Sequence, residues 1–127
     1  MKIWVLAGAL VIASNGFALA QDAAAGEAAF GKCRPCHDVG EEARIKLGPP
    51  LNGIDGRQAG TFEGFNYSDA IKGSGITWNK EKFAVWVAGP QALVPGTRMA
   101  FAGDKDEAEV ANIWAYLNQF KADGSKK

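Results

Sequence analysis

The chain has 127 residues, of which 47% are hydrophobic, and its 14 basic and 14 acidic residues leave no net charge at pH 7. This length fits a single domain, and nothing in the charge suggests nucleic-acid binding, which calls for a basic patch or stripe. Only two cysteines and one histidine are present, and they lie together within five residues.

The first 20 residues have the pattern of a secretory signal peptide. Lys2 is followed by an uncharged apolar run over residues 3–12, and a small-residue motif of the A-x-A type ends at Ala20. An uncleaved membrane anchor is the alternative, but the run is shorter than the roughly 20 residues that span a bilayer. We therefore expect cleavage after Ala20, export to the periplasm and a mature domain at residues 21–127.

The first predicted helix of this domain begins near Asp22, whose side chain can act as its N-cap. Gly26 and Phe30 are four residues apart and therefore share one face of the helix. Because Gly26 has no side chain, a second helix can approach that face closely.

Two further long helices and one short helix are predicted. The apolar spacing indicates helices over about residues 79–88 and 105–121, the latter with an acidic first turn that suits the helix dipole. A short helix is expected at about residues 68–72. Residues 40–65 are rich in turn formers and contain no alternating run, so they predict a loop and no strand.

A loop of about 25 residues without regular structure is unusual in a compact domain. It becomes reasonable if the loop wraps a large flat ligand that supplies the missing core. The sequence therefore predicts an all-α fold, with three main helices, a short one and long loops wrapped around a bound group.

The cysteines and the histidine form Cys33-x-x-Cys36-His37, a covalent haem attachment signal. Two intervening residues allow one turn of chain to present both sulfurs to the two vinyl groups of one porphyrin. His37 then lies beneath the iron and supplies an imidazole nitrogen as axial ligand.

Other cysteine sites fit this sequence less well. An isolated pair in an exported chain would otherwise suggest one disulfide, but the adjacent histidine favours haem. A thioredoxin-like redox pair lies at the end of a strand in a βαβ pattern, and no such strand is predicted. A structural zinc site needs four ligands, and the chain offers three cysteine and histidine side chains.

A six-coordinate iron needs a second axial ligand, and the sequence favours Met99. There is no second histidine, and Met99 is the only methionine beyond the expected cleavage site. A lone methionine is usually core filler. Elimination and the turn-forming context of residues 94–99 favour the ligand here, and a thioether ligand raises the reduction potential.

These features resemble class I cytochromes c, close to the mitochondrial type and the bacterial cytochrome c2 group. The resemblance covers essentially the whole mature chain and implies a cytochrome c fold around one covalent haem c. It implies that Gly26 and Phe30 pack against Tyr116 of the last helix. It also implies that the Pro49 carbonyl accepts the ring N–H of His37, which fixes the tautomer of that ring.

The resemblance further implies a set of side chains around the haem propionates, with Arg57, Tyr67 and Trp78 as donors and Thr97 nearby. Phe101 would shield the haem edge.

Two positions depart from the pattern of the relatives. Trp86 stands where a tyrosine often bonds the ligand sulfur, and Ile71 stands where many relatives carry a polar residue near a buried water. Both bear on the reduction potential, and neither removes a ligand.

As to function, the resemblance implies a soluble, monomeric electron carrier and not an enzyme. Such a protein shuttles single electrons from a quinol–cytochrome c oxidoreductase to a terminal oxidase or a photosynthetic reaction centre. The alternatives are an electron acceptor for a periplasmic dehydrogenase, and a haem enzyme or sensor in which Met99 dissociates. The carrier is favoured because protein fills both axial positions.

Partner docking is expected at an exposed haem edge ringed by basic residues, with acidic residues such as Glu107 and Glu109 lying elsewhere. The alternative is that these charges only keep the protein soluble. The basic residues of this expected ring are Lys32, Arg34, Lys46, Arg98 and Lys105.

Overall fold

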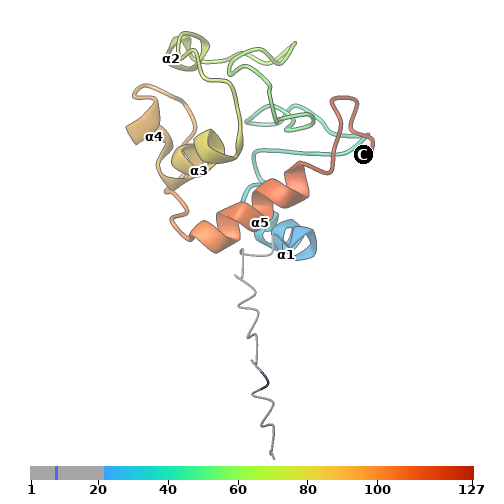
Figure 1. The fold of residues 1–127 in the computed structure, drawn as a ribbon. Coiled ribbons are helices and arrows are strands. Elements are labelled where there is room, and N and C mark those ends of the chain that lie inside the picture. The colour runs from blue at the N-terminus through green and yellow to red at the C-terminus, as the bar shows by residue number, and fades with distance from the viewer. Residues whose placement is uncertain (1–7, 9–21) are drawn as a thin grey trace, which may run out of the picture.

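The computed structural model describes Gly8 and residues 22–127, and over this part the fold is all-α, as predicted. The elements are α1 (Ala23–Ala29), the 3-10 turn η1 (Phe30–Lys32), α2 (Asp69–Lys72), α3 (Lys80–Ala88), α4 (Pro90–Leu93) and α5 (Glu107–Leu117). Figure 1 shows α5 lying across α1 at one end of the domain, with α3 and α4 beside it and the long loops on the far side. Apart from Gly8, the expected signal peptide lies outside the described residues.

The close contact between α1 and α5 is possible because Gly26 has no side chain. Asp22 caps α1, and its carboxylate accepts the backbone N–H groups of Ala24 and Ala25. A Cβ atom at Gly26 would lie only 1.8 Å from the backbone oxygen of Asn112 in α5. The two helices therefore approach as the sequence predicts, because position 26 carries only hydrogen.

Replacing Gly26 by alanine is expected to lower the free energy of unfolding by about 1–3 kcal/mol, because the new methyl group forces the helices apart. Gly31→Ala is the matched control, since a Cβ at Gly31 has no atom within 4 Å and the φ of Gly31 is not positive. Guanidinium unfolding of both variants checks this. Equal stability of the two variants would contradict the close approach.

Two predicted boundaries need correction. The last helix covers Glu107–Leu117 and not residues 105–121, because the Asp106 side chain caps its start at the Glu109 N–H. Beyond its end, Phe120 pairs with Lys126 in an antiparallel bridge, so the chain turns back instead of continuing the helix. The structure also has a one-turn helix, α4, which begins at Pro90 and which the sequence analysis does not predict.

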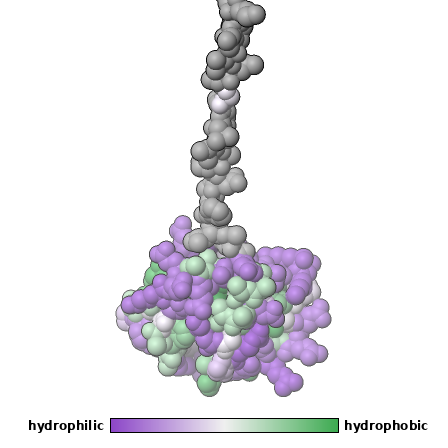
Figure 2. All heavy atoms as spheres, turned by 90° about the horizontal axis from the view of Figure 1, so that it is seen from below, coloured by the Kyte–Doolittle hydropathy of each residue, from purple (hydrophilic) through white to green (hydrophobic). Residues whose placement is uncertain are grey.

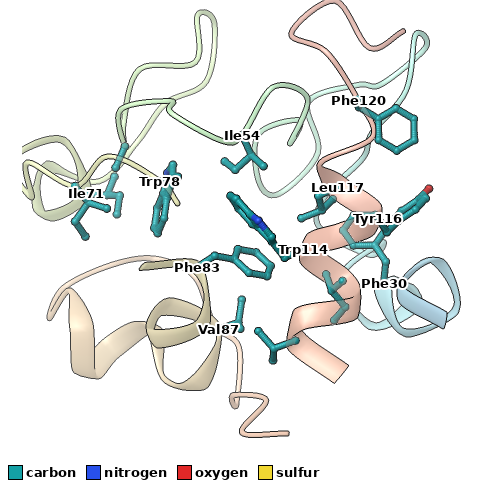
Figure 3. Packing of buried hydrophobic residues seen from close by; sticks show 14 of the residues in the cluster. Phe30, Ile54, Ile71, Trp78, Phe83, Val87, Trp114, Tyr116, Leu117 and Phe120 are labelled. Carbon is teal, nitrogen blue, oxygen red and sulfur yellow. The ribbon is translucent and has the colours of Figure 1, made fainter. Parts of the chain in front are cut away.

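The core forms where α3, α5 and η1 meet the loops. Phe83 of α3 packs against Trp114 of α5 with ring centroids 5.2 Å apart, and Phe30 packs against Tyr116 at 5.6 Å, as the resemblance implies. Figure 3 shows these side chains converging with Ile54 of the long loop.

The surface at the α1–α5 end is largely hydrophilic, with smaller apolar areas between the polar side chains (Figure 2). Large hydrophobic residues are exposed at Ile45, Leu47 and Val85. Within residues 22–127, no helix has the length and apolar character needed to cross a membrane.

Candidate functional site

A cavity of about 640 Å³ opens beside the core, between the Cys33–His37 turn and the loops. Its size lies in the range of cofactor sites. All the candidate site residues named from the sequence line this one cavity: Cys33, Cys36, His37, Pro49, Arg57, Tyr67, Trp78, Thr97 and Met99.

The walls of the cavity are core side chains. Phe30, Phe83 and Leu117 are buried members of the hydrophobic core, and they line the cavity as well. Trp86 and Ile71, the two departures from the pattern of the relatives, also line it. Trp86 packs against Trp78 with ring centroids 5.4 Å apart. A large apolar ligand in this cavity would therefore complete the core rather than sit on the surface.

The turn from η1 to His37 holds both cysteines at the cavity. The N–H of Cys36 and the N–H of His37 both donate to the carbonyl of Cys33, at 3.1 and 2.8 Å. The thiols are not joined in a disulfide. Burial raises the pKa of the Cys33 thiol to about 11, whereas a redox-active cysteine of the thioredoxin type needs a lowered pKa. The free thiols argue against a disulfide, and the raised pKa of Cys33 argues against a redox pair of the thioredoxin type.

The His37 ring is held in one orientation. Its Nδ1 lies 2.8 Å from the carbonyl oxygen of Pro49, and because a carbonyl only accepts, Nδ1 carries the proton. Burial lowers the pKa of His37, which the Pro49 hydrogen bond partly opposes, so the ring is neutral with Nε2 unprotonated. A Cβ at Gly48 would come within 2.3 Å of the ring. Glycine at that position therefore makes room for the imidazole.

The polar side of the cavity is basic. The charged residues that line it, within the part of the chain described, are Lys32, Lys46, Arg57 and Arg98. Arg57 Nη1 donates to the carbonyl oxygens of Pro50 at 2.9 Å and Asn52 at 3.2 Å. Burial lowers the pKa of Arg57. A partly buried guanidinium without a carboxylate on the cavity wall suits a ligand that brings carboxylates of its own.

Tyr67 and Thr97 line the same cavity as Arg57, and each is held by hydrogen bonds. The Tyr67 hydroxyl accepts the N–H of Phe62 at 3.0 Å, which leaves its own proton free to donate. The Gln91 side chain donates to the Thr97 carbonyl and ties α4 to the segment that carries Met99. Sequence analysis did not single out Gln91 as a contact, because its partner is set by how α4 folds back.

The structure differs from the expected ring of basic residues in how these residues are paired. Lys32 Nζ lies 3.2 Å from Asp104 Oδ2 and 2.8 Å from Glu109 Oε2, so the prediction that Glu109 lies away from the ring is wrong. Arg34 stacks over the Phe30 ring, with its Cζ 5.0 Å from the centroid. Lys46 and Arg98 are exposed and line the cavity mouth.

Comparison of the sequence with known families gives a result that agrees with this cavity, its paired cysteines and its oriented histidine. A sequence model of the family described as Cytochrome c matches residues 23–121. The chain belongs to the cytochrome c family. Its cofactor is haem c, bound covalently through Cys33 and Cys36, and this cytochrome is an electron-transfer protein and not an enzyme.

Several bacterial relatives of this cytochrome are similar over nearly their whole length. Cytochrome c2 of Rhodoplanes tepidamans is 56% identical over 107 residues, which cover 84% of this chain and all of that protein. Cytochrome c2 of Blastochloris viridis is 54% identical over 118 residues and 93% of each chain. Cytochrome c-550 of Nitrobacter winogradskyi is 52% identical over 106 residues, 84% of this chain and 97% of that protein.

A solved structure shows the same fold. Cytochrome cH from Methylobacterium extorquens superposes with a TM-score of 0.72 at 45% sequence identity, covering 76% of this chain and 97% of that chain. These similarities place this cytochrome in the bacterial cytochrome c2 group.

The residues present fit haem c. The cavity walls are apolar core side chains, both thiols and the free Nε2 of His37 belong to one turn at its edge, and the charged residues on its wall are basic. When bound, the haem iron supplies a centre that accepts and releases one electron. The apolar core side chains on the cavity walls would orient that centre and keep water from it.

Proposed function

We propose that this protein is a periplasmic monohaem electron carrier that shuttles single electrons between membrane redox complexes. The donor would be a quinol–cytochrome c oxidoreductase, and the acceptor a terminal oxidase or a photosynthetic reaction centre. The main observation in support of this proposal is that His37 and Met99 line one cavity together with both cysteines. If His37 and Met99 both bound the iron, no open iron site would remain for a substrate, as a carrier requires.

The axial ligands in this proposal are His37 and Met99. The 2.8 Å contact to Pro49 supports His37, because the protonated Nδ1 leaves Nε2 as the ligand atom. Met99 lines the cavity from the segment between α4 and α5. Its thioether favours the reduced iron and raises the reduction potential.

The propionates of the haem would be bound by Arg57, Tyr67, Trp78 and Thr97. Arg57 is supported by its partly buried position and by the two carbonyl groups that fix its guanidinium. These donors reduce the free-energy cost of placing propionate charges beside the core.

Residues 1–20 would direct export and be removed after Ala20, which leaves residues 21–127 as the periplasmic domain. The pattern of Lys2, the apolar run and the A-x-A motif supports this processing.

Docking would use the cavity mouth around Lys46 and Arg98. Both are exposed cations, each held by one backbone carbonyl, that of Arg34 for Lys46 and that of Asn66 for Arg98. Leu47 is 81% exposed beside them and also lines the cavity. Small polar interfaces of this kind suit transient redox encounters.

Reversing the charge in Lys46→Glu is expected to slow association with an acidic oxidase or reaction centre severalfold at low ionic strength, because long-range attraction governs such rates. Lys127→Glu is the control, since Lys127 is an exposed tail residue outside the cavity lining. Stopped-flow electron transfer over a range of salt concentrations measures the effect, which salt should screen over about 8–10 Å. A rate that is flat with salt, or equal losses in both variants, would contradict a charge-steered docking face.

A further inference from the structure

Asn52 is a buried polar residue that lies outside the lining of the haem cavity. It is only 8% exposed. Its Oδ1 accepts the Gly40 N–H at 2.8 Å, and its Nδ2 donates to the Gly40 carbonyl at 2.9 Å. One side chain therefore binds both backbone groups of a residue 12 positions away, as a buried polar side chain requires. We call this pair of hydrogen bonds the Asn52–Gly40 clamp.

The backbone of the same segment holds the Arg57 guanidinium. Arg57 Nη1 donates to the carbonyl oxygens of Pro50 at 2.9 Å and Asn52 at 3.2 Å. The Arg57 backbone is held separately, because its carbonyl accepts the Trp78 N–H at 2.9 Å. The Phe62 ring, whose centroid lies 5.4 Å from Arg57 Cζ, attracts the cation but accepts no directed bond from it. A shift of residues 50–52 would therefore move the guanidinium and leave the Arg57 backbone in place.

Two other contacts hold residues 50–53, and each is a single backbone hydrogen bond. The Leu51 N–H donates to the Asp38 carbonyl at 3.0 Å, and the Gly53 N–H donates to the Phe120 carbonyl at 3.3 Å. The clamp lies between them and adds two bonds from one side chain. A single substitution can therefore remove the clamp while both backbone contacts remain.

Gly40 itself is packed against the C-terminal hairpin, residues 120–126. The Lys121 N–H donates to the Ser125 carbonyl at 2.8 Å, and Phe120 pairs with Lys126. The red end of the chain in Figure 1 thereby lies beside the cyan loop, and a Cβ atom at Gly124 would collide with the Gly40 carbonyl. Asn52 is therefore bound to a residue that the hairpin packs against.

We propose that Asn52 is a positioning residue for Arg57, because the clamp fixes the two carbonyl groups that hold the guanidinium at the cavity wall. The inference rests on the proposed role of Arg57 at the haem propionates. A guanidinium beside these carboxylates offsets their negative charge. When it is displaced, the uncompensated charge favours the oxidised iron, which carries one more positive charge. Asn52 thus raises the reduction potential from outside the cavity lining.

The test is the reduction potential of the holoprotein. In Asn52→Ala the equilibrium constant for reduction should fall about two- to tenfold, as expected for loss of a coupled contact, and tenfold corresponds to about 59 mV for one electron. Asn112→Ala is the matched control. Asn112 Oδ1 accepts the Asp22 N–H at 2.9 Å across 90 residues, and Asn112 lies outside the cavity lining. This control should keep the wild-type potential.

Hydrogen exchange at the Gly40 amide, followed by NMR, reports on the clamp itself. Asn52→Ala should exchange faster at this amide. Gly124→Ala should also speed the exchange and lower the potential, because it disturbs Gly40 from the hairpin. Gly75→Ala is its control, since Gly75 and Gly124 have φ values of 69° and 86° but a Cβ at Gly75 has no atom within 4 Å. Faster exchange with an unchanged potential shows a merely structural clamp and overturns the proposal.

Arg57→Gln separates the positioning role from the role of Arg57. It should lower the potential at least as much as Asn52→Ala, and the double variant should fall no further, because both changes act through one guanidinium. If Arg57→Gln lowers the potential while Asn52→Ala matches the wild type, the positioning role is wrong and the role of Arg57 stands. If Arg57→Gln matches the wild type, both inferences fall. A further fall in the double variant overturns the positioning role as well.

Discussion

A variant with both cysteines replaced, Cys33→Ala plus Cys36→Ala, is expected to lack covalent haem and to be largely unfolded. The cavity walls are core side chains such as Phe30, Phe83 and Leu117. Burial of one such side chain contributes about 1.5–3 kcal/mol, and the total stability of a domain is only about 5–15 kcal/mol. If several of these side chains are exposed to water at once, a domain this small therefore loses most of its stability.

Far-UV circular dichroism and a pyridine haemochrome spectrum measure this result. The wild-type protein, matured with its haem attachment machinery, should have the mass of residues 21–127 plus one haem, which also tests cleavage after Ala20. Val85→Ala, at an exposed position of α3, is the control and should keep both haem and fold. A wild-type haemochrome spectrum typical of two free vinyl groups, or a well-folded double variant, would contradict the covalent assignment.

The second large effect is expected at Met99. Met99→Ala should abolish the weak near-infrared band of iron–methionine ligation in the oxidised protein. It should lower the reduction potential by on the order of 0.1 V, because axial ligands set haem potentials. The reduced variant should also bind carbon monoxide at neutral pH, since the iron then has an open position.

Absorption spectra, a redox titration and carbon monoxide binding together check this expectation. Leu47→Ala is the control, because Leu47 lines the same cavity yet is 81% exposed. If Met99→Ala keeps the band and still excludes carbon monoxide, another residue is the ligand.

Features with a local physical cause were predictable from the sequence. The Asp22 cap, the close approach at Gly26 and the absence of strands in residues 40–65 follow from propensity and spacing, and the structure has each of them. The cysteine and histidine spacing indicated the haem. The contact of His37 with Pro49 came from the family resemblance, since 12 residues separate the two and no spacing rule joins them.

Only the tertiary structure decided where the last helix stops and how the charges pair. The helix ends at Leu117 because the chain beyond it finds partners elsewhere, with Phe120 opposite Lys126. Lys32 and Asp104 are 72 residues apart, and each has the local context of an exposed charge. An ion pair between them exists because the fold buries one carboxylate beside η1, and such a burial depends on the packing of the whole chain rather than on any local pattern.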